Sequence, residues 1–207
     1  LDIGDYAAMM KISIIIGVLH LVLANALVAL QNRGRSKAIA NLGWIACLCG
    51  GVLLAYSDPD SGLASVALAL LISGLGTVLL FTSERPIVKL PVDVVWRLVD
   101  GLRALTGVMG LFGDVLSYMR LFALGLASAS LALTFNNLAT QIIDAVPGLG
   151  LLLALLLLLL GHTINLALAV MSGVVHGLRL NFIEFYKWGM TGEGKPFQKF
   201  ARKEVEP

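Results

Sequence analysis

Charged residues are scarce in this chain of 207 residues: Asp, Glu, Lys and Arg together make up 14% of it. A soluble globular domain carries about 25%, whereas hydrophobic residues reach 58% here. The chain also lacks the alternation of polar and apolar residues that marks a membrane β-barrel, because its apolar runs are continuous. These shortages exclude a soluble domain and a barrel, and they leave a membrane protein built of helices.

Cysteine is almost missing as well. Cys47 and Cys49 lie two residues apart in an apolar run, where they point to different sides of a helix. We expect both to be reduced packing residues, with no disulfide and no metal site. The first residues, LDIGDY, lack an initiating methionine and a basic region, so they are no signal peptide. We expect the chain to be a segment of a longer protein.

Five apolar runs have the length of about 20 residues that a bilayer crossing requires. They cover residues 9–30, 38–56, 63–82, 111–143 and 149–185. The sequence therefore predicts an all-α integral membrane protein with about five transmembrane helices. We divide it into three supporting transmembrane helices (residues 1–90), an interfacial amphipathic helix (91–110), two long helices (111–188) and a cytoplasmic tail (189–207).

The last two runs are longer than a membrane requires. At 1.5 Å per residue, a helix of more than about 30 residues approaches 50 Å, against a hydrocarbon core of about 30 Å. Such helices must tilt strongly or project from the bilayer. Before them, residues 91–109 carry Asp93, Arg97, Asp100 and Arg103 among apolar side chains. This pattern is typical of an amphipathic helix, which we expect at the cytoplasmic surface.

Basic residues sort cleanly between alternate loops. Three lie in residues 33–37, four in residues 84–103 and five after Phe185, whereas residues 57–62 and 144–148 contain none. Loops rich in Lys and Arg stay on the cytoplasmic side of a membrane. We therefore expect Leu1 outside and Pro207 in the cytoplasm.

Polar side chains concentrate in the last two runs. In the fifth run, a series of residues recurs at steps of three or four, which places it on one helical face. The polar members are His162, Asn165, Ser172, His176 and Arg179, and Ala169 stands between Asn165 and Ser172. In the fourth run, Asp114, Ser117 and Arg120 step by three, and Ser128, Asn136, Asn137 and Gln141 follow. For a single Ser, Asn or His, a hydrogen bond between packed helices is a sufficient explanation.

Arg120 needs a further explanation, because an arginine at the centre of a membrane helix costs about 2.5–3.5 kcal/mol on the insertion scale. It lies nine residues after Leu111, where its run starts, which is too deep for easy snorkelling. Asp114 and Glu184 are both near cytoplasmic ends of their runs. We therefore expect the carboxylate partner of Arg120 on another chain. Arg179 can snorkel to the inner interface.

Two stretches carry recognisable motifs. They are FGDVLSYMRLFALGLASASLA (residues 112–132) and GHTINLALAVMSGVVHGLRLNFIEFYKW (residues 161–188), followed by GEGKPFQKF (residues 192–200). These motifs closely resemble the end of the membrane stator subunit of V-type and archaeal-type rotary ATPases, called subunit a or subunit I. KISIIIGVLHLVLANAL (residues 11–27) also looks like an earlier segment of that family.

The resemblance implies an ion-translocating subunit that works against a ring of proteolipids, the c or K subunits, each with a buried carboxylate. The essential arginine of the family falls on Arg120 in SYMRL, and its second arginine falls on Arg179 in HGLRL. The transported ion would be H⁺ or Na⁺, and no cofactor is implied. Further implied partners are the peripheral stalk, the ATPase head and the lipid bilayer, and no nucleic acid.

The family's two half-channels would be lined by the polar residues of this chain. The cytoplasmic half-channel is assigned Asp114, Ser117, Asn181 and Glu184. The external half-channel is assigned His20, Ser128, Asn136, Asn137, Gln141, His162, Asn165, Ser172 and His176. Ala169 and Ser128 stand where the eukaryotic pattern has a glutamate and a histidine, which indicates a prokaryotic member in a plasma membrane. The family's cytoplasmic N-terminal arm and about three earlier crossings have no counterpart in these residues.

GMTGEGKP (residues 189–196) has the G-x-x-x-x-G-K spacing of a phosphate-binding loop. Pro196 stands where Ser or Thr is required, and the stretch follows a membrane helix instead of a buried strand. We expect no nucleotide-binding site, so that any ATP chemistry belongs to partner subunits.

Two other classes of function compete with the stator. The first is a secondary transporter with an intramembrane arginine site, which predicts internal repeats and broken midplane helices; the sequence shows no repeat and no Pro near the middle of a run. The second is a passive anchor subunit, which would not need Arg120. An Arg120 side chain that faces lipid, or that is neutralised within its own chain, would contradict the stator hypothesis.

Overall fold

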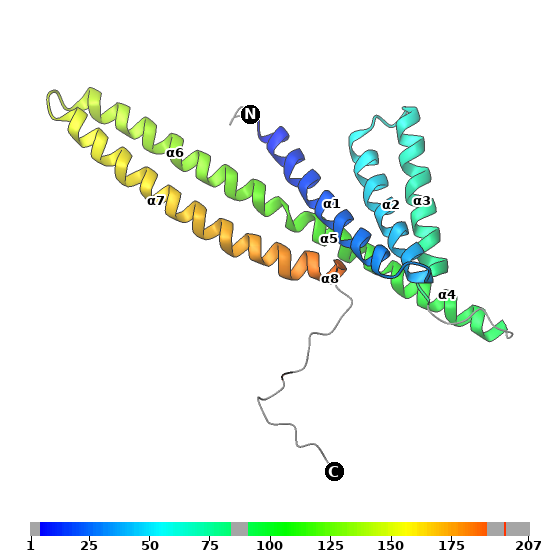
Figure 1. Cartoon of the computed structure of the whole chain (residues 1–207). Helices are drawn as coiled ribbons and strands as arrows, with labels where there is room; N and C mark the ends of the chain where they lie inside the picture. The colour runs from blue at the N-terminus through cyan, green and yellow to red at the C-terminus, as the bar shows by residue number, and fades with distance from the viewer. Residues whose placement is uncertain (1–4, 84–90, 190–196, 198–207) are drawn as a thin grey trace, which may run out of the picture.

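The computed structural model describes residues 5–83, 91–189 and 197, and its regular elements there are all helices (Figure 1). These elements are α1 (Tyr6–Gln31), α2 (Ser36–Tyr56), α3 (Gly62–Phe81), α4 (Pro91–Leu105), α5 (Gly107–Ser117), α6 (Met119–Ala145), α7 (Gly150–Arg179), the π-helix η1 (Leu180–Phe185) and α8 (Tyr186–Gly189). Within the described residues, five helical spans are long and apolar enough to cross a membrane. The all-α membrane fold predicted from the sequence is confirmed.

Local sequence determines where several helices begin and turn. The Asp5 side chain accepts a hydrogen bond from the Ala8 N–H at 3.0 Å and caps α1, as short polar residues do at helix starts. Gly34 and Gly148 adopt φ angles of 83° and 85° in the turns after α1 and α6. Only glycine enters this left-handed region at no steric cost. The two glycines therefore allow the chain to reverse between α1 and α2 and between α6 and α7.

Two groups of helices differ in direction and in burial. Figure 1 shows α1, α2 and α3 standing together, whereas α6 and α7 form a long antiparallel hairpin that runs obliquely away from them. In the most hydrophobic 18-residue stretch of α1, 44% is buried within the structure. The corresponding shares are 6% for the span that contains α6 and 11% for the span that contains α7. The last two helices thus run obliquely to α2 and α3, and their tilt in a bilayer stays a prediction. Most of their surface is left for lipid or another protein.

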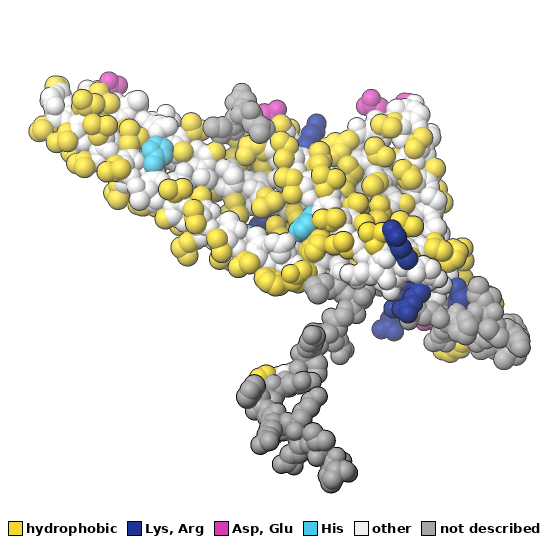
Figure 2. Space-filling model, in the orientation of Figure 1, with side chains coloured by type: hydrophobic (Ala, Val, Ile, Leu, Met, Phe, Trp, Pro, Cys, Tyr) yellow, Lys and Arg dark blue, Asp and Glu magenta, His cyan; other side chains and the backbone are white. Residues whose placement is uncertain are grey.

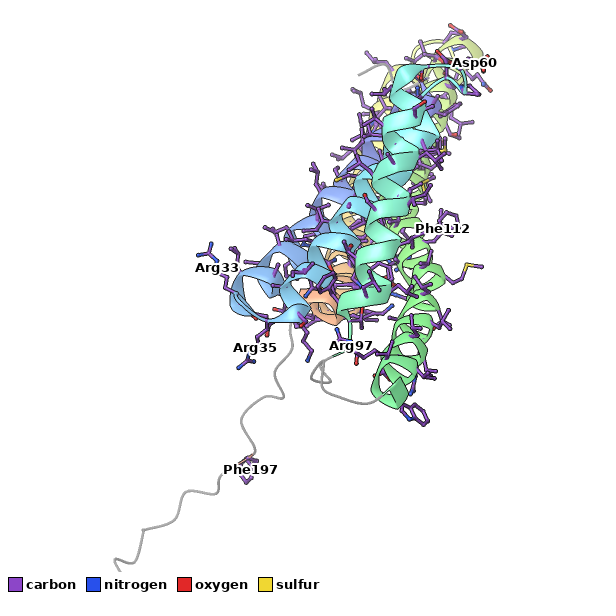
Figure 3. The ribbon with its side chains drawn as sticks, turned by 90° about the vertical axis from the view of Figure 1, so that its right-hand side faces the viewer. Arg33, Arg35, Asp60, Arg97, Phe112 and Phe197 are labelled. Carbon is purple, nitrogen blue, oxygen red and sulfur yellow. The ribbon has the colours of Figure 1, made fainter. Side chains whose placement is uncertain are left out.

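Charged residues lie at opposite ends of the molecule. Figure 3 shows Arg33, Arg35 and Arg97 at one end and Asp60 at the other. In Figure 2, hydrophobic side chains cover the surface between these ends. Among the described residues, the labelled arginines of the regions predicted to be cytoplasmic therefore lie on one side. The predicted cytoplasmic tail lies outside the described residues, apart from Gly189 and Phe197.

Helix α4, the predicted interfacial helix, is held against the end of α3. Arg97 Nη2 donates a hydrogen bond to the Leu80 carbonyl oxygen at 3.1 Å. A Cβ atom on Gly101 would overlap the backbone of α3 at Leu79, so the two helices meet without intervening side chains. Other apolar side chains of α4, such as Leu102, are exposed. The helix thus presents an apolar surface outside the helical bundle.

Helices α2 and α3 cross at two glycines, and this crossing yields a first prediction. A Cβ atom on Gly74 would lie 2.7 Å from the Gly43 carbonyl oxygen, whereas one on Gly76 would meet nothing within 4 Å. We expect Gly74→Leu to lower the free energy of unfolding by about 1–3 kcal/mol, the usual cost of overpacking. Gly76→Leu is the matched control and should change it by less than about 0.5 kcal/mol. Unfolding of the purified protein in detergent measures both, and equal losses would contradict the crossing.

Candidate functional site

Arg120 lies directly after a break between two helices. α5 ends and α6 begins on either side of Tyr118, which is 1% exposed. A Cβ atom on Gly17 of α1 would lie 2.6 Å from the Tyr118 ring, so the missing side chain of Gly17 makes room for this tyrosine. The break places Arg120 in the first turn of α6. The sequence argument had assumed an uninterrupted helix from Leu111.

Arg120 has an acidic neighbour within its own chain. Arg120 Nη2 lies 4.0 Å from Glu184 Oε1, and the two side chains are 26% and 2% exposed. The expectation that no carboxylate of this chain reaches Arg120 is therefore wrong. The reason is geometric: α6 and α7 are antiparallel, so the first turn of α6 lies beside the residues that follow α7.

This ion pair is a loose one. Charge-assisted hydrogen bonds between a guanidinium and a carboxylate are about 2.7–2.9 Å long, and 4.0 Å is outside that range. Arg120 Nη1 and Glu184 Oε2 are both buried and have no hydrogen-bond partner among the described residues. Most buried polar groups are satisfied. The Arg120 guanidinium therefore keeps donor capacity that its own chain does not use.

The segment that carries Glu184 is a π-helix, η1, directly after α7. Such segments are rare and are frequent at functional sites. In η1, Glu184 is buried, whereas Asn181 is exposed and donates from Nδ2 to the Gly177 carbonyl oxygen at 3.1 Å. Arg179, the last residue of α7, is exposed, and its side chain makes no hydrogen bond or ion pair with the described residues. The two arginines therefore have different surroundings: Arg120 lies beside Glu184, whereas Arg179 is exposed at the end of α7.

Asp114, assigned to the cytoplasmic half-channel, already has two partners. Lys187 Nζ lies 2.7 Å from Asp114 Oδ2, and Trp188 Nε1 donates to the same oxygen at 2.6 Å. The Trp188 ring also packs edge-on against Trp44, with ring centroids 5.3 Å apart. Sequence reasoning missed Lys187 and Trp188, although both stand inside the stretch that carries the family motif. Ser117, three residues after Asp114, is half-buried.

The double contact to Asp114 leads to a second prediction. Asp114→Ala removes the acceptor of two donors that come from α8, so we expect the free energy of unfolding to fall by about 1–3 kcal/mol. Asp114→Asn keeps an acceptor oxygen and should retain more than half of that contribution. Detergent unfolding of the two variants makes the comparison. Equal losses for Ala and Asn would show that the charge matters and the hydrogen bonds do not.

His20 is placed apart from the other residues assigned to the external half-channel. His20 Nδ1 and Tyr118 Oη lie 2.8 Å apart, and the histidine ring stacks on Phe185 with centroids 4.4 Å apart. Tyr118 precedes Arg120 by two residues, and Phe185 follows Glu184. His20 therefore belongs to the surroundings of the arginine pair. Tyr118 and Phe185 were missed as neighbours, although Tyr118 lies within the SYMRL motif.

Most of the external set lies along the seam between α6 and α7. Ser128 Oγ donates to Asn165 Oδ1 at 3.0 Å, and Asn165 Nδ2 donates back to the Ser128 carbonyl oxygen at 3.0 Å. Farther from Arg120, His162 Nε2 and Asn136 Oδ1 lie 3.1 Å apart. Ser172 joins Ser128 and Asn165 in lining a hollow of about 380 Å³. These polar groups form a row along the hairpin.

Three residues assigned to the external half-channel do not take part in these contacts between α6 and α7. Asn137 and Gln141 are exposed on α6. His176 is half-buried on α7, and its Nδ1 atom has no hydrogen-bond partner among the described residues. Helix packing accounts for the Ser128–Asn165 and Asn136–His162 contacts, but it does not satisfy His176.

No protein-family model matches the sequence. Over 202 residues, the chain is 34% identical to the V-type ATP synthase subunit I of Chlamydia trachomatis serovar D, an alignment that covers 90% of this chain and 27% of that protein. It is 33% identical over 206 residues to the A-type ATP synthase subunit I of Pyrococcus horikoshii, covering 94% and 29%. It is also 42% identical over 107 residues to the V-type ATP synthase subunit I of Chlamydia pneumoniae, covering 52% and 15%.

The chain thus spans less than a third of the length of these relatives. The two longer alignments cover 90% and 94% of the chain, so they extend beyond the α6–α7 hairpin into the supporting helices α1 to α3. The resemblance seen in the motifs is therefore confirmed over the supporting helices too. Over these residues, the chain belongs to the family of V-type and A-type ATP synthase subunit I.

Proposed function

We propose that the chain is the ion-translocating membrane part of the stator of a V-type or A-type rotary ATPase. In this role, α6 and α7 face a ring of proteolipids whose buried carboxylates carry H⁺ or Na⁺. One observation carries the proposal: Arg120, only loosely paired, stands at the start of a long hairpin that its own chain leaves mostly uncovered. The names of the relatives support the same conclusion.

Arg120 acts as a fixed positive charge. A guanidinium stays protonated even in a dry site, so it favours the ionised form of a passing carboxylate and makes that carboxylate release its ion. The same charge repels free cations and prevents a leak between the two half-channels. Each ion that crosses about 100 mV carries about 2.3 kcal/mol, and the rotation of the ring couples this work to ATP.

The contact with Glu184 bears directly on this role. A bidentate, hydrogen-bonded carboxylate would occupy the guanidinium and would contradict the stator hypothesis. Because the contact is 4.0 Å long and the Arg120 side chain is 26% exposed, Arg120 can still bind a second carboxylate. In the proposed mechanism, Glu184 holds the Arg120 side chain between two passages of rotor carboxylates, and the rotor carboxylate replaces this weak contact.

The half-channels follow the two polar groups of residues. Ser117, Asn181 and Glu184 line the cytoplasmic opening, with Asp114 at its margin and His20 beside it. The row of polar residues on the α6–α7 seam lines the external opening. Arg179 is the second arginine and reaches toward the ring from the end of α7.

The orientation and the partners complete the proposal. The end with Arg33, Arg35 and Arg97 lies in the cytoplasm of a prokaryotic cell, where loops rich in Lys and Arg stay. The turn between α6 and α7 lies on the outer side of the plasma membrane. A peripheral stalk joins the complete subunit to the ATPase head, which carries out the chemistry of ATP.

A secondary transporter is the second candidate function. The feature that favours it is the helix break at Tyr118, which lies beside the Arg120–Glu184 pair. Secondary transporters typically bind their substrates and coupling ions at broken helices. ATP-driven ion transport by purified complexes that contain Arg120→Gln separates the two functions. A stator variant loses this transport while the complex stays intact. A transporter subunit leaves it unchanged.

A further inference from the structure

A second hollow, of about 360 Å³, lies among α1, α2, α3 and α5 and has no wall from α6 or α7. Its lining is apolar almost throughout and includes Val18, Trp44, Leu48, Leu71 and Leu111. We propose that this hollow binds one acyl chain of an anionic phospholipid, whose phosphate lies at Lys11 and Tyr56. The inference does not depend on the proposed role of Arg120.

The length of the hollow fits one leaflet of a bilayer. On α2, the lining residues extend from Trp44 to Tyr56, which is about 18 Å at a rise of 1.5 Å per residue. Half of a hydrocarbon core is about 15 Å. The Trp44 end is bounded by α5, because a Cβ atom on Gly107 would lie 3.4 Å from the Trp44 ring. The chain of a lipid would enter from the Tyr56 end and reach Trp44.

The Tyr56 end offers the groups that an anionic headgroup needs. Lys11 Nζ lies 5.7 Å from the centroid of the Tyr56 ring, and Lys11 is the one Lys or Arg in α1. Ser57 Oγ, in the next residue, is buried and has no hydrogen-bond partner among the described residues. A lysine and a tyrosine at the end of membrane helices lie at headgroup level. An ammonium and a hydroxyl there can bind a phosphate by charge-assisted hydrogen bonds.

A lipid chain fits the hollow better than a helix of another protein segment. A helix with its side chains is about 10–12 Å across, which is too wide for a hollow of about 360 Å³. An apolar helix in the hollow would also leave the Lys11 ammonium group without an anionic partner. A single extended acyl chain needs only a narrow apolar path, and its headgroup accounts for Lys11.

Two glycines provide a matched pair of variants. Gly51 lines the hollow, and a Cβ atom there would meet nothing within 4 Å. Gly76 has the same open space and lies outside the lining. Gly51→Leu therefore fills the hollow without a backbone clash, whereas Gly76→Leu leaves it open. Neither glycine contacts the residues around Arg120.

The experiment measures the fluorescence of Trp44 in the full-length protein, reconstituted in vesicles that contain either phosphatidylglycerol or phosphatidylcholine with brominated acyl chains. Bromine quenches tryptophan at contact, and the Trp44→Phe variant isolates the signal of Trp44. We expect brominated phosphatidylglycerol to quench at about fivefold lower mole fraction than brominated phosphatidylcholine, the preference that one basic residue gives near a membrane surface. Lys11→Gln should remove this preference. Gly51→Leu should remove the quenching, and Gly76→Leu should keep it.

Each other result overturns the proposal in a distinct way. Equal quenching by the two lipids in the unchanged protein would exclude an anionic headgroup at Lys11. Quenching that persists in Gly51→Leu would show that bromine reaches Trp44 by another path. A Trp44 that neither lipid quenches would show that another part of the full-length protein covers the hollow.

Discussion

Replacing Arg120 by glutamine is expected to abolish ATP-driven ion transport in the assembled ATPase. Glutamine is still a polar side chain with an NH₂ donor group, but it is shorter than arginine and loses the charge that makes a rotor carboxylate release its ion. We expect transport to fall about 100-fold or more, the scale on which preorganised charge or hydrogen-bond donors act in a site. Ion uptake by vesicles containing the purified complex, started by ATP, measures this directly.

Two controls show whether the loss comes from the charge. Complexes with Arg120→Gln must contain all subunits in normal amounts, because a missing stator would also stop transport. Arg120→Lys keeps a positive charge but not the fork of donors, and it should retain more transport than Arg120→Gln. Normal transport with an intact Arg120→Gln complex would disprove the stator proposal and leave the transporter.

The sequence predicted those parts of the fold that are determined locally, by the residues of a single continuous segment. An apolar run of sufficient length crosses a membrane whatever its neighbours are, so the five spans were predictable from composition. The turn at Gly148 was marked by a Pro and a Gly between apolar runs. The expectation that the last hairpin tilts followed from its length alone.

The site was predicted less completely, because its geometry depends on where helices meet. The break at Tyr118 carries no proline, and it shifts Arg120 from an estimated mid-helix position to the first turn of α6. The antiparallel hairpin then places Glu184 4.0 Å from Arg120, a contact that no spacing along the sequence reveals. His20 is 98 residues from Tyr118 along the chain, so only the tertiary fold shows that these side chains meet.

Glu184→Gln is expected to destabilise the protein and to slow transport without abolishing it. Removing one partner of a buried pair leaves the other charge uncompensated. We expect the free energy of unfolding to fall by about 1–3 kcal/mol, the cost of an unsatisfied buried group. This loss is smaller than the loss for a fully buried pair, because Arg120 is 26% exposed. Transport should slow because Arg120 would then hold each rotor carboxylate more tightly.

Combining the two substitutions separates stability from function. In the protein with both Arg120→Gln and Glu184→Gln, no charge of this pair is left buried, so most of the lost stability should return while transport stays at background. The comparison is a double-mutant cycle, in which residues in contact are non-additive. Asp114→Asn is the control carboxylate, because its partners are Lys187 and Trp188, and its effect should add to that of Arg120→Gln. If Glu184→Gln were additive in the same way, the two charges would not interact, and Glu184 could not hold Arg120 between passages of the rotor.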